Sequence, residues 1–167
     1  MKKVLAIFLA FIIGLSMSAQ IQNKLLGFTL GTTTKSEVYE KYKNENHFLE
    51  KSDSYSVGGT IEFAGQKWNI TTFTFYHDRL LSVQFSLIDL GTSISIMDST
   101  WDYLRLTLLD KYSEFNYCLT SEYLFFQDDK THLALSYLDS GNNKALSLIY
   151  SDCALKEQKR QAEEGEL

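Results

Sequence analysis

A strict alternation of apolar and polar side chains near the middle of the chain most constrains its fold. Between residues 81 and 87 the apolar positions are Leu81, Val83, Phe85 and Leu87, and every residue between them is serine or glutamine. Successive side chains of a strand point to opposite faces of a sheet, so this period of two predicts a strand with one buried face. A helix does not use the same pattern, because its apolar residues recur every three to four positions.

Several other segments have the composition of strands. They span residues 60–63, 68–76, 122–127, 132–138 and 144–150. Proline is absent from the chain, so Gly, Asn, Asp and Ser mark the turns between these segments. Turns this short join antiparallel neighbours, so the segments predict an antiparallel sheet.

Helices are predicted at two places along the chain. Thr34 and Glu37 have the spacing of a capping box, which predicts a helix that starts after Thr34 and ends near residue 44 or 46. The second helix is predicted over residues 97–112. Its apolar stripe consists of Met97, Trp101, Leu104, Leu108 and Tyr112. The predicted fold class is α+β, with two helices packed on one face of a twisted antiparallel β-sheet.

The two halves of the chain resemble each other. A Leu-Gly-Thr sequence precedes each predicted helix, at Leu30–Thr32 and at Leu90–Thr92. Self-similarity along a chain is the mark of a repeat architecture, so we expect two tandem irregular α-β repeats over residues 25–88 and 89–151. The spacing differs between the helices and the strands of the two halves, so a chance likeness of two helix–hairpin units is the alternative.

The segment Gly31–Val38, and in part the segment from Gly91 onward, resembles the start of small exported modules of the outer-membrane-assembly lipoprotein and β-lactamase-inhibitor-protein type. This resemblance implies a helix followed by an antiparallel meander, and in the inhibitor-like members two such units stand in tandem. It also implies binding of proteins or surfaces without catalysis. The chain lacks the lipid-bearing cysteine of the lipoproteins, which argues against a role in membrane assembly.

Residues 1–19 have the composition of a secretory signal peptide. Lys2 and Lys3 precede an apolar run over residues 4–15, and small residues follow it. Cleavage is predicted before Gln20 or, alternatively, after Ser18. The apolar run is shorter than the roughly 20 residues of a membrane span. We therefore expect an exported protein, periplasmic or extracellular, with no transmembrane segment, a single domain over residues 20–153 and a charged tail over 154–167.

The net charge argues against some classes of partner, and the positions of the two cysteines bear on whether they form a disulfide. Without Lys2 and Lys3 the formal net charge of −5 becomes −7, which argues against nucleic acid or an anionic membrane as partner. Export favours a disulfide between Cys118 and Cys153. The predicted strand order instead places them at opposite ends of the sheet, beyond the roughly 7 Å that a disulfide spans. We expect two free, buried thiols, and a different strand order would reverse this.

The sequence contains no recognisable catalytic, cofactor or metal motif. His47, His77 and His132 are isolated from one another, whereas metal ligands cluster at short spacings. No Gly-x-Ser-x-Gly elbow is present. The Asp128–Asp129 pair occupies a predicted turn, where Asp bonds its own backbone. No catalytic, metal or cofactor residue is therefore predicted.

One predicted strand carries a candidate binding surface. Phe73 and Phe75 share one face of the strand over residues 68–76. The other face carries Trp68, Ile70, Thr72, Thr74 and Tyr76. Trp and Tyr on an uncovered sheet face are typical of a recognition surface, and burial of both rings at the edge of the core is the alternative. We expect a non-catalytic binding protein for a protein or an extended ligand; the alternatives are an envelope hydrolase and a structural accessory of envelope assembly.

Overall fold

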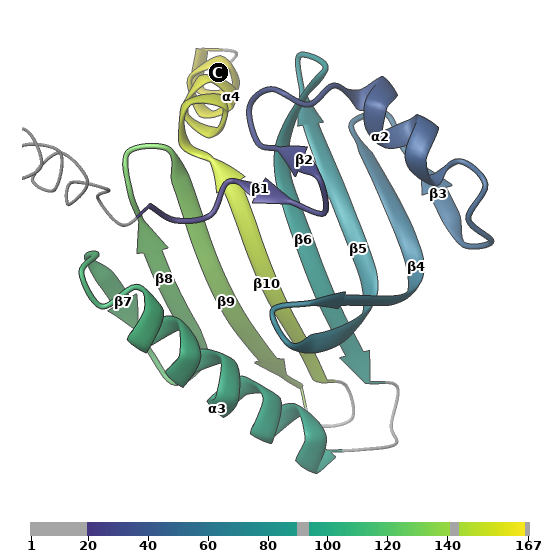
Figure 1. Cartoon of the computed structure of the whole chain (residues 1–167). Coiled ribbons are helices and arrows are strands. Elements are labelled where there is room, and N and C mark those ends of the chain that lie inside the picture. The colour runs from purple at the N-terminus through teal and green to yellow at the C-terminus, as the bar shows by residue number, and fades with distance from the viewer. Residues whose placement is uncertain (1–19, 90–93, 141–143, 166–167) are drawn as a thin grey trace, which may run out of the picture.

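The computed structural model describes residues 20–89, 94–140 and 144–165 (Figure 1). The predicted signal peptide, residues 1–19, lies outside the described residues. The elements in chain order are β1 (Lys24–Leu25), β2 (Phe28–Thr29), α2 (Lys35–Tyr42), β3 (Phe48–Glu50), β4 (Ser54–Phe63), β5 (Gln66–Tyr76), β6 (Arg79–Asp89), α3 (Ile94–Lys111), β7 (Tyr117–Leu119), β8 (Tyr123–Gln127), β9 (Thr131–Asp139), β10 (Lys144–Asp152) and α4 (Cys153–Gly165).

An eight-stranded antiparallel sheet dominates the fold, with strand order β3-β4-β5-β6-β10-β9-β8-β7. The predicted antiparallel sheet is confirmed. Two of its strands, β3 and β7, were not predicted; each is three residues long and lies at an outer edge of the sheet. The β1–β2 pair forms a separate two-stranded sheet. Such short strands carry too few residues to show a period in sequence.

The two halves of the sheet meet in the middle of the molecule. Each half consists of a helix followed by four strands, and the last strand of the first half, β6, pairs with the last strand of the second, β10. The pairing runs from Lys144 opposite Asp89 to Ser151 opposite Ser82. From its outer edge to the middle of the sheet, the first half runs in chain order, β3-β4-β5-β6. The second half also runs in chain order from its own outer edge, β7-β8-β9-β10, so the two halves meet at their last strands.

One face of the sheet carries the core. Phe85 pairs with Leu148, which in turn pairs with Leu135, and all three side chains are fully buried. Two of the helices contact this face. The ring of Tyr42 in α2 lies 5.3 Å from that of Phe73, measured between centroids. Trp101 of α3 stacks on Tyr137 of β9 at 6.0 Å.

The capping box at the start of α2 is confirmed. The backbone N–H of Glu37 donates to Thr34 Oγ1 at 3.3 Å, and the N–H of Thr34 donates to Glu37 Oε2 at 2.7 Å. These two bonds pair backbone donors that the first helical turn leaves without an intrahelical acceptor. Val38 and Tyr42 form the buried side of the helix.

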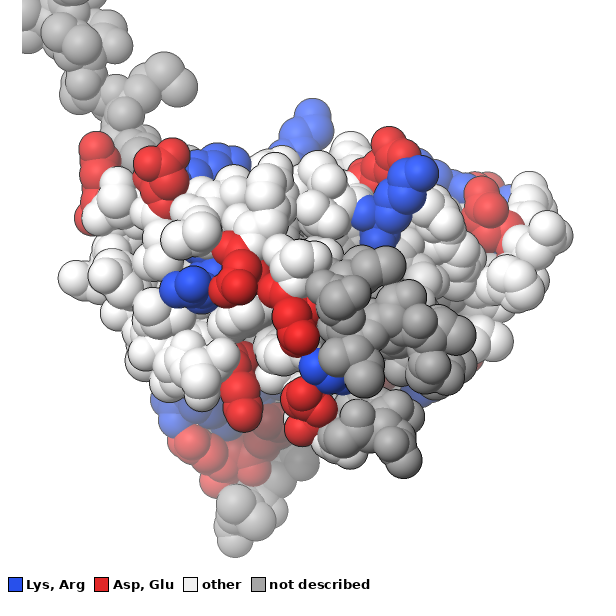
Figure 2. Space-filling view, turned by 90° about the horizontal axis from the view of Figure 1, so that it is seen from below, with Lys and Arg blue, Asp and Glu red and all other residues white. Residues whose placement is uncertain are grey.

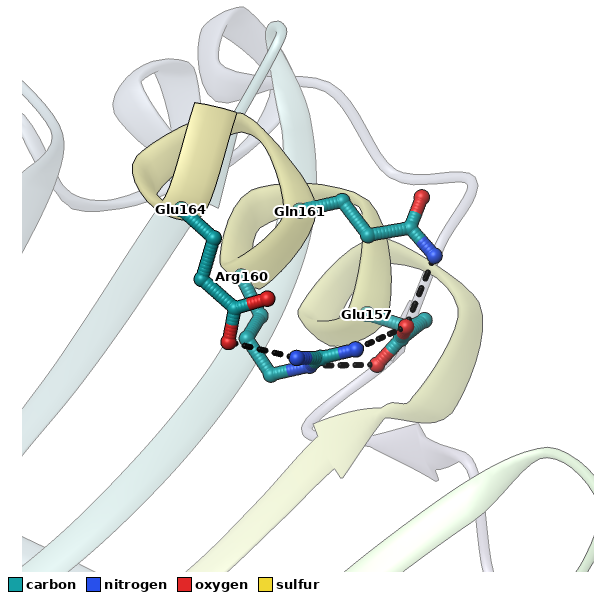
Figure 3. Close-up of polar contacts among 4 residues, drawn as sticks. All are labelled: Glu157, Arg160, Gln161 and Glu164. Atoms are coloured by element: carbon teal, nitrogen blue, oxygen red, sulfur yellow. Dashed lines mark hydrogen bonds and ion pairs between the residues drawn. The ribbon is translucent and has the colours of Figure 1, made fainter. Parts of the chain in front are cut away.

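Within the charged tail predicted for residues 154–167, either a frayed helix or a disordered segment was expected, and the described part as far as Gly165 belongs to a third helix, α4. The carboxylate of Asp152 accepts the N–H of Leu155 at 2.8 Å, which caps the helix. Ion pairs between residues three and four apart follow along its length, as Figure 3 shows for Arg160 with Glu157 and Glu164. Charged residues at this spacing stabilise a helix without a buried face, and none of the residues of α4 is buried.

The β4–β5 hairpin folds back over the core. Its ladder shifts register between Gly58 and Ile61, which marks a β-bulge. Beyond the bulge the hairpin crosses in front of β6 (Figure 1). The ring of Phe63 then stacks on Phe85 at 4.2 Å and meets Tyr150 edge-on at 5.8 Å. The hairpin tip therefore covers core side chains of both halves of the sheet.

Candidate functional site

Most of the predicted surface on β5 lies on the sheet face opposite the core. Ile70, Thr72, Thr74 and Tyr76 are partly exposed, and the residues that alternate with them are buried. Cross-strand neighbours extend this surface over β4, β6, β10 and β9. We call it the open face and define it as Ile70, Thr72, Thr74 and Tyr76 together with Ser56, Ser82, Gln84, Ser86, Ala134, Ser136, Ser147 and Ile149.

Trp68 does not belong to the open face, and its predicted place there is wrong. Its side chain is 1% exposed. The indole N–H donates to the carbonyl oxygen of Phe63 at 2.9 Å, and its ring lies 6.0 Å from that of Phe85. The folded-back hairpin tip therefore encloses Trp68. A period-two pattern assumes a straight strand, and it fails where a bulge bends the hairpin.

Hydroxyl and amide groups on the open face bond to one another across strands. The side-chain amide of Gln84 donates to Ser86 Oγ at 3.1 Å and to Ser147 Oγ at 3.2 Å. The hydroxyls of Ser56 and Thr72 lie 3.1 Å apart. The Gln84–Ser147 contact joins β6 to β10 and the Ser56–Thr72 contact joins β4 to β5, whereas the Gln84–Ser86 bond lies within β6. None of the residues that define the open face carries a charge.

Charges lie elsewhere on the molecule. In the view from below, acidic side chains gather beside basic ones at the end of the sheet (Figure 2). The buried Lys144 Nζ lies 3.2 Å from Asp98 Oδ1 and 3.0 Å from Asp139 Oδ2. The hydroxyl of Tyr137 also donates to Asp98, and this bond followed by that of Lys144 lowers the pKa of Asp98. The single ammonium of Lys144 is therefore shared by two carboxylates.

A cleft of about 660 Å³ lies between α4 and the sheet. His132 and Cys153 line it, together with charged side chains of α4. The Cys153 thiol donates to the backbone carbonyl of Asp128 at 3.7 Å. Burial, with Asp128 next, raises the pKa of Cys153 to about 11. A thiol with this pKa is protonated near neutral pH, so it is a poor nucleophile.

Among the described residues, His132 makes no hydrogen bond with Cys153. Burial, followed by the nearby Lys156, lowers its pKa. Its Nδ1 atom is buried without a hydrogen-bond partner among the described residues. The cleft therefore contains a thiol and an imidazole without the hydrogen bond that activates such pairs.

The predicted turn role of Asp128 is confirmed. Its carboxylate accepts the N–H groups of Lys130 and Thr131 at 2.8 and 2.6 Å, and that of Ile21 at 2.7 Å. These bonds use the carboxylate to hold the backbone of the β8–β9 turn and the start of the described chain.

Both cysteines are free, but Cys118 is exposed, so its predicted burial is wrong. It lies in the middle of the edge strand β7, between the exposed side chains of Tyr117 and Leu119. This edge was not predicted, because three residues are too few to show a period. Its only signal in sequence is a short apolar run, at residues 117–119, with no charged residue in it.

Across residues 20–89, 94–140 and 144–165, no group of three or more His, Cys, Asp and Glu residues is placed to hold a metal ion. None of the described helices is long and apolar enough to cross a membrane. Searches against family models, curated proteins and solved structures found no match to this chain.

Proposed function

We propose that this protein is an exported, non-catalytic binding protein that docks a protein partner on the open face. The single observation that carries the proposal is the uncharged, partly exposed surface of Thr, Ser, Gln and Ile side chains across five neighbouring strands. A sheet face that only needs solvation is normally rich in charged residues. The core of protein interfaces is depleted of charge in the same way.

Small side chains favour a broad partner over a small molecule. Ser, Thr and Ala dominate the open face, and such side chains make a flat surface. Small-molecule sites are instead concave and lined by large apolar groups. Cross-strand bonds such as that between Ser56 and Thr72 hold the surface in place, so association would immobilise few further side chains.

We make two further proposals about the fold that are consistent with this role. The first is that the two helix-plus-four-strand halves are tandem repeats that arose by duplication, which the reversed strand order about β6 and β10 favours. The second is that α2 and α3 cover only the core face, which leaves the other face free for a partner except at its His132 end, where α4 lies against the sheet. Export rests on the composition of residues 1–19.

The test is a cross-linked capture from the envelope fraction of the producing cell. The baits are the parent chain and a Thr72→Lys/Ser147→Lys variant that places two charges on the open face. A Ser113→Lys/Gln158→Lys variant adds the same charges at exposed sites away from it. Circular dichroism and thermal unfolding establish that all three baits are folded.

We expect a partner that the parent and the Ser113/Gln158 variant capture equally and that the Thr72/Ser147 variant loses. The purified partner should then bind the parent at least about tenfold more tightly than the Thr72/Ser147 variant, which corresponds to about 1.4 kcal/mol. Equal capture by both charged variants, or no captured protein, would remove the open face from the proposal.

A further inference from the structure

The outer edge of strand β7 has the features of a self-pairing surface. β7 is the last strand of the sheet order, and no described strand lies beyond it (Figure 1). Edge strands present unpaired backbone groups that template pairing with another chain. Proteins usually protect such edges with charges. The opposite edge strand, β3, contains Glu50 and is followed by Lys51, whereas β7 has no charged residue.

The hydrogen-bond pattern shows which backbone groups of β7 point outward. Thr120 N–H donates to the carbonyl of Tyr123 at 2.8 Å, which makes these two residues a hydrogen-bonded pair at the β7–β8 turn. Such pairs alternate along an antiparallel ladder, so Cys118 and Phe125 form the next one. The backbone groups of Tyr117 and Leu119 therefore point away from β8.

This geometry is self-complementary. If two copies of β7 pair antiparallel about a two-fold axis through Cys118, Tyr117 of one copy lies opposite Leu119 of the other. Their outward N–H and C=O groups then form the hydrogen-bonded pairs. The two Cys118 residues face each other at a non-hydrogen-bonded position, where α-carbons are about 4.5 Å apart. Disulfides join α-carbons roughly 4.4–6.8 Å apart, so the two thiols are within bonding reach.

The exposed apolar area is too small to hold a dimer without a covalent bond. Tyr117 is 54% exposed and Tyr123 is 39% exposed, so together they offer on the order of 200 Å² per copy. A standard stable interface buries roughly 800 Å² per partner. A disulfide would make up the difference, because it converts a weak association into an intramolecular contact.

We propose that this protein forms a two-fold dimer through antiparallel pairing of β7 with β7 of a second copy, locked by a disulfide between the two Cys118 residues. The bond forms by exchange with a low-molecular-weight disulfide. The Cys118 thiolate of one copy attacks it, forms a mixed disulfide and releases one small thiol. Cys118 of the second copy then displaces the second small thiol. Two protein thiols are oxidised, and one small disulfide is reduced to two thiols.

The proposal goes beyond the binding role of the open face. The Cys118 side chain lies in the same cross-strand row as Phe125, Ala134 and Ile149. Pairing at β7 would therefore join the open faces of two copies into one continuous surface. Dimer formation is measured on the purified protein without any partner. A failure of the dimer and a failure of partner binding on the open face can therefore be told apart.

The test uses purified protein titrated with oxidised glutathione, with mass measured by light scattering and non-reducing electrophoresis. The parent and Cys153→Ser should both form a covalent dimer, and Cys118→Ser should form none. Leu119→Pro removes one outward N–H per copy at a position where an edge strand tolerates proline. It should slow covalent dimer formation at least about tenfold while Cys118 stays equally reactive toward a small thiol reagent.

Three outcomes would overturn the proposal. The first is a parent that stops at the glutathione mixed disulfide and stays monomeric. The second is a dimer that depends on Cys153. The third is a Leu119→Pro dimer that forms as fast as the parent dimer, which would mean random cross-linking of an exposed thiol. Thermal unfolding of each variant separates these outcomes from misfolding.

Discussion

At the scale of single residues, Trp68 joins the hairpin tip to the sheet. Its indole N–H donates to the carbonyl of Phe63, and its ring packs near Phe85. Phe63 in turn stacks on Phe85 and contacts Tyr150 across the middle of the sheet. A buried Trp with its polar atom satisfied contributes both packing and a directional bond.

The enclosure of Trp68 should make its side chain important for stability. We expect Trp68→Ala to lower the free energy of unfolding by about 3–5 kcal/mol, the usual cost of truncating a buried Trp. The neighbouring Lys67→Ala, at an exposed position, should change it by less than about 0.5 kcal/mol. Urea unfolding followed by circular dichroism measures both. A loss below about 1 kcal/mol for Trp68→Ala would contradict its enclosure by the hairpin.

His132 is the residue from which we predict a pH dependence. Its pKa is lowered below the ordinary 6.5, first by burial and then by Lys156. The unfolded chain therefore binds more protons than the folded one between the folded pKa and 6.5. This contribution to stability is present above pH 6.5 and is lost as the pH falls through the folded pKa.

NMR titration should give a His132 pKa below 6.5. Lys156→Gln should raise that pKa toward the ordinary value, whereas Lys130→Gln, which removes a charge that does not shift it, should leave it unchanged. The parent should lose more stability between pH 7 and pH 5 than His132→Gln does. A His132 pKa at or above 6.5 would contradict the burial that the structure shows.

At the scale of elements, the start of α4 depends on the Leu-Gly-Thr sequence at Leu30–Thr32. A Cβ atom at Gly31 would lie 2.5 Å from Asp152 Oδ2, and the φ angle of Gly31 is +76°. The same carboxylate caps α4 through the N–H of Leu155. Because glycine has no Cβ, the backbone at Gly31 can lie against Asp152 at the end of β10 without displacing the carboxylate that caps α4.

We expect Gly31→Ala to destabilise the protein by at least about 1 kcal/mol more than Gly27→Ala. Gly27 is the matched control, because its φ of +90° is equally unfavourable for alanine and its nearest neighbour, Lys41 Nζ, would be 3.8 Å away. Urea unfolding measures the difference. Amide hydrogen exchange in α4 should also increase in Gly31→Ala only, and equal effects of the two substitutions would contradict the close approach.

At the scale of the whole molecule, the halves share one core. β6 and β10 pair along most of their lengths, and Phe63 of the first half contacts Tyr150 of the second. The buried side chains on both sides of this seam belong to a single cluster. Separation of the halves would expose that apolar surface and leave β6 and β10 as long unpaired edges.

We therefore predict that neither half folds alone. Residues 20–92 and 93–167, produced separately, should each show little cooperative unfolding, and an equimolar mixture should regain it. The control is the intact chain cleaved after folding between residues 92 and 93, which should stay folded. Circular dichroism during thermal unfolding reports all four samples, and a first half that unfolds cooperatively by itself would contradict the shared core.

Local interactions account for what the sequence by itself determined. The alternation around Phe85, the capping box of Thr34 and Glu37, and the turn role of Asp128 depend on neighbours within a few residues, and all are present in the structure. Ile70, Thr72, Thr74 and Tyr76 followed from the same period-two rule. These features were predictable because backbone geometry sets which nearby side chains share a face.

Only the tertiary structure decided the pairing of β6 with β10, the enclosure of Trp68 and the position of β7 at the outer edge of the sheet. Each depends on contacts between residues far apart in sequence, such as Phe63 with Tyr150. The β-bulge after Gly58 bends the hairpin, and the shared core determines which strand lies beside which. The physical reason is that local propensity gives each strand its pattern, whereas burial of the combined apolar surface selects the arrangement of the strands.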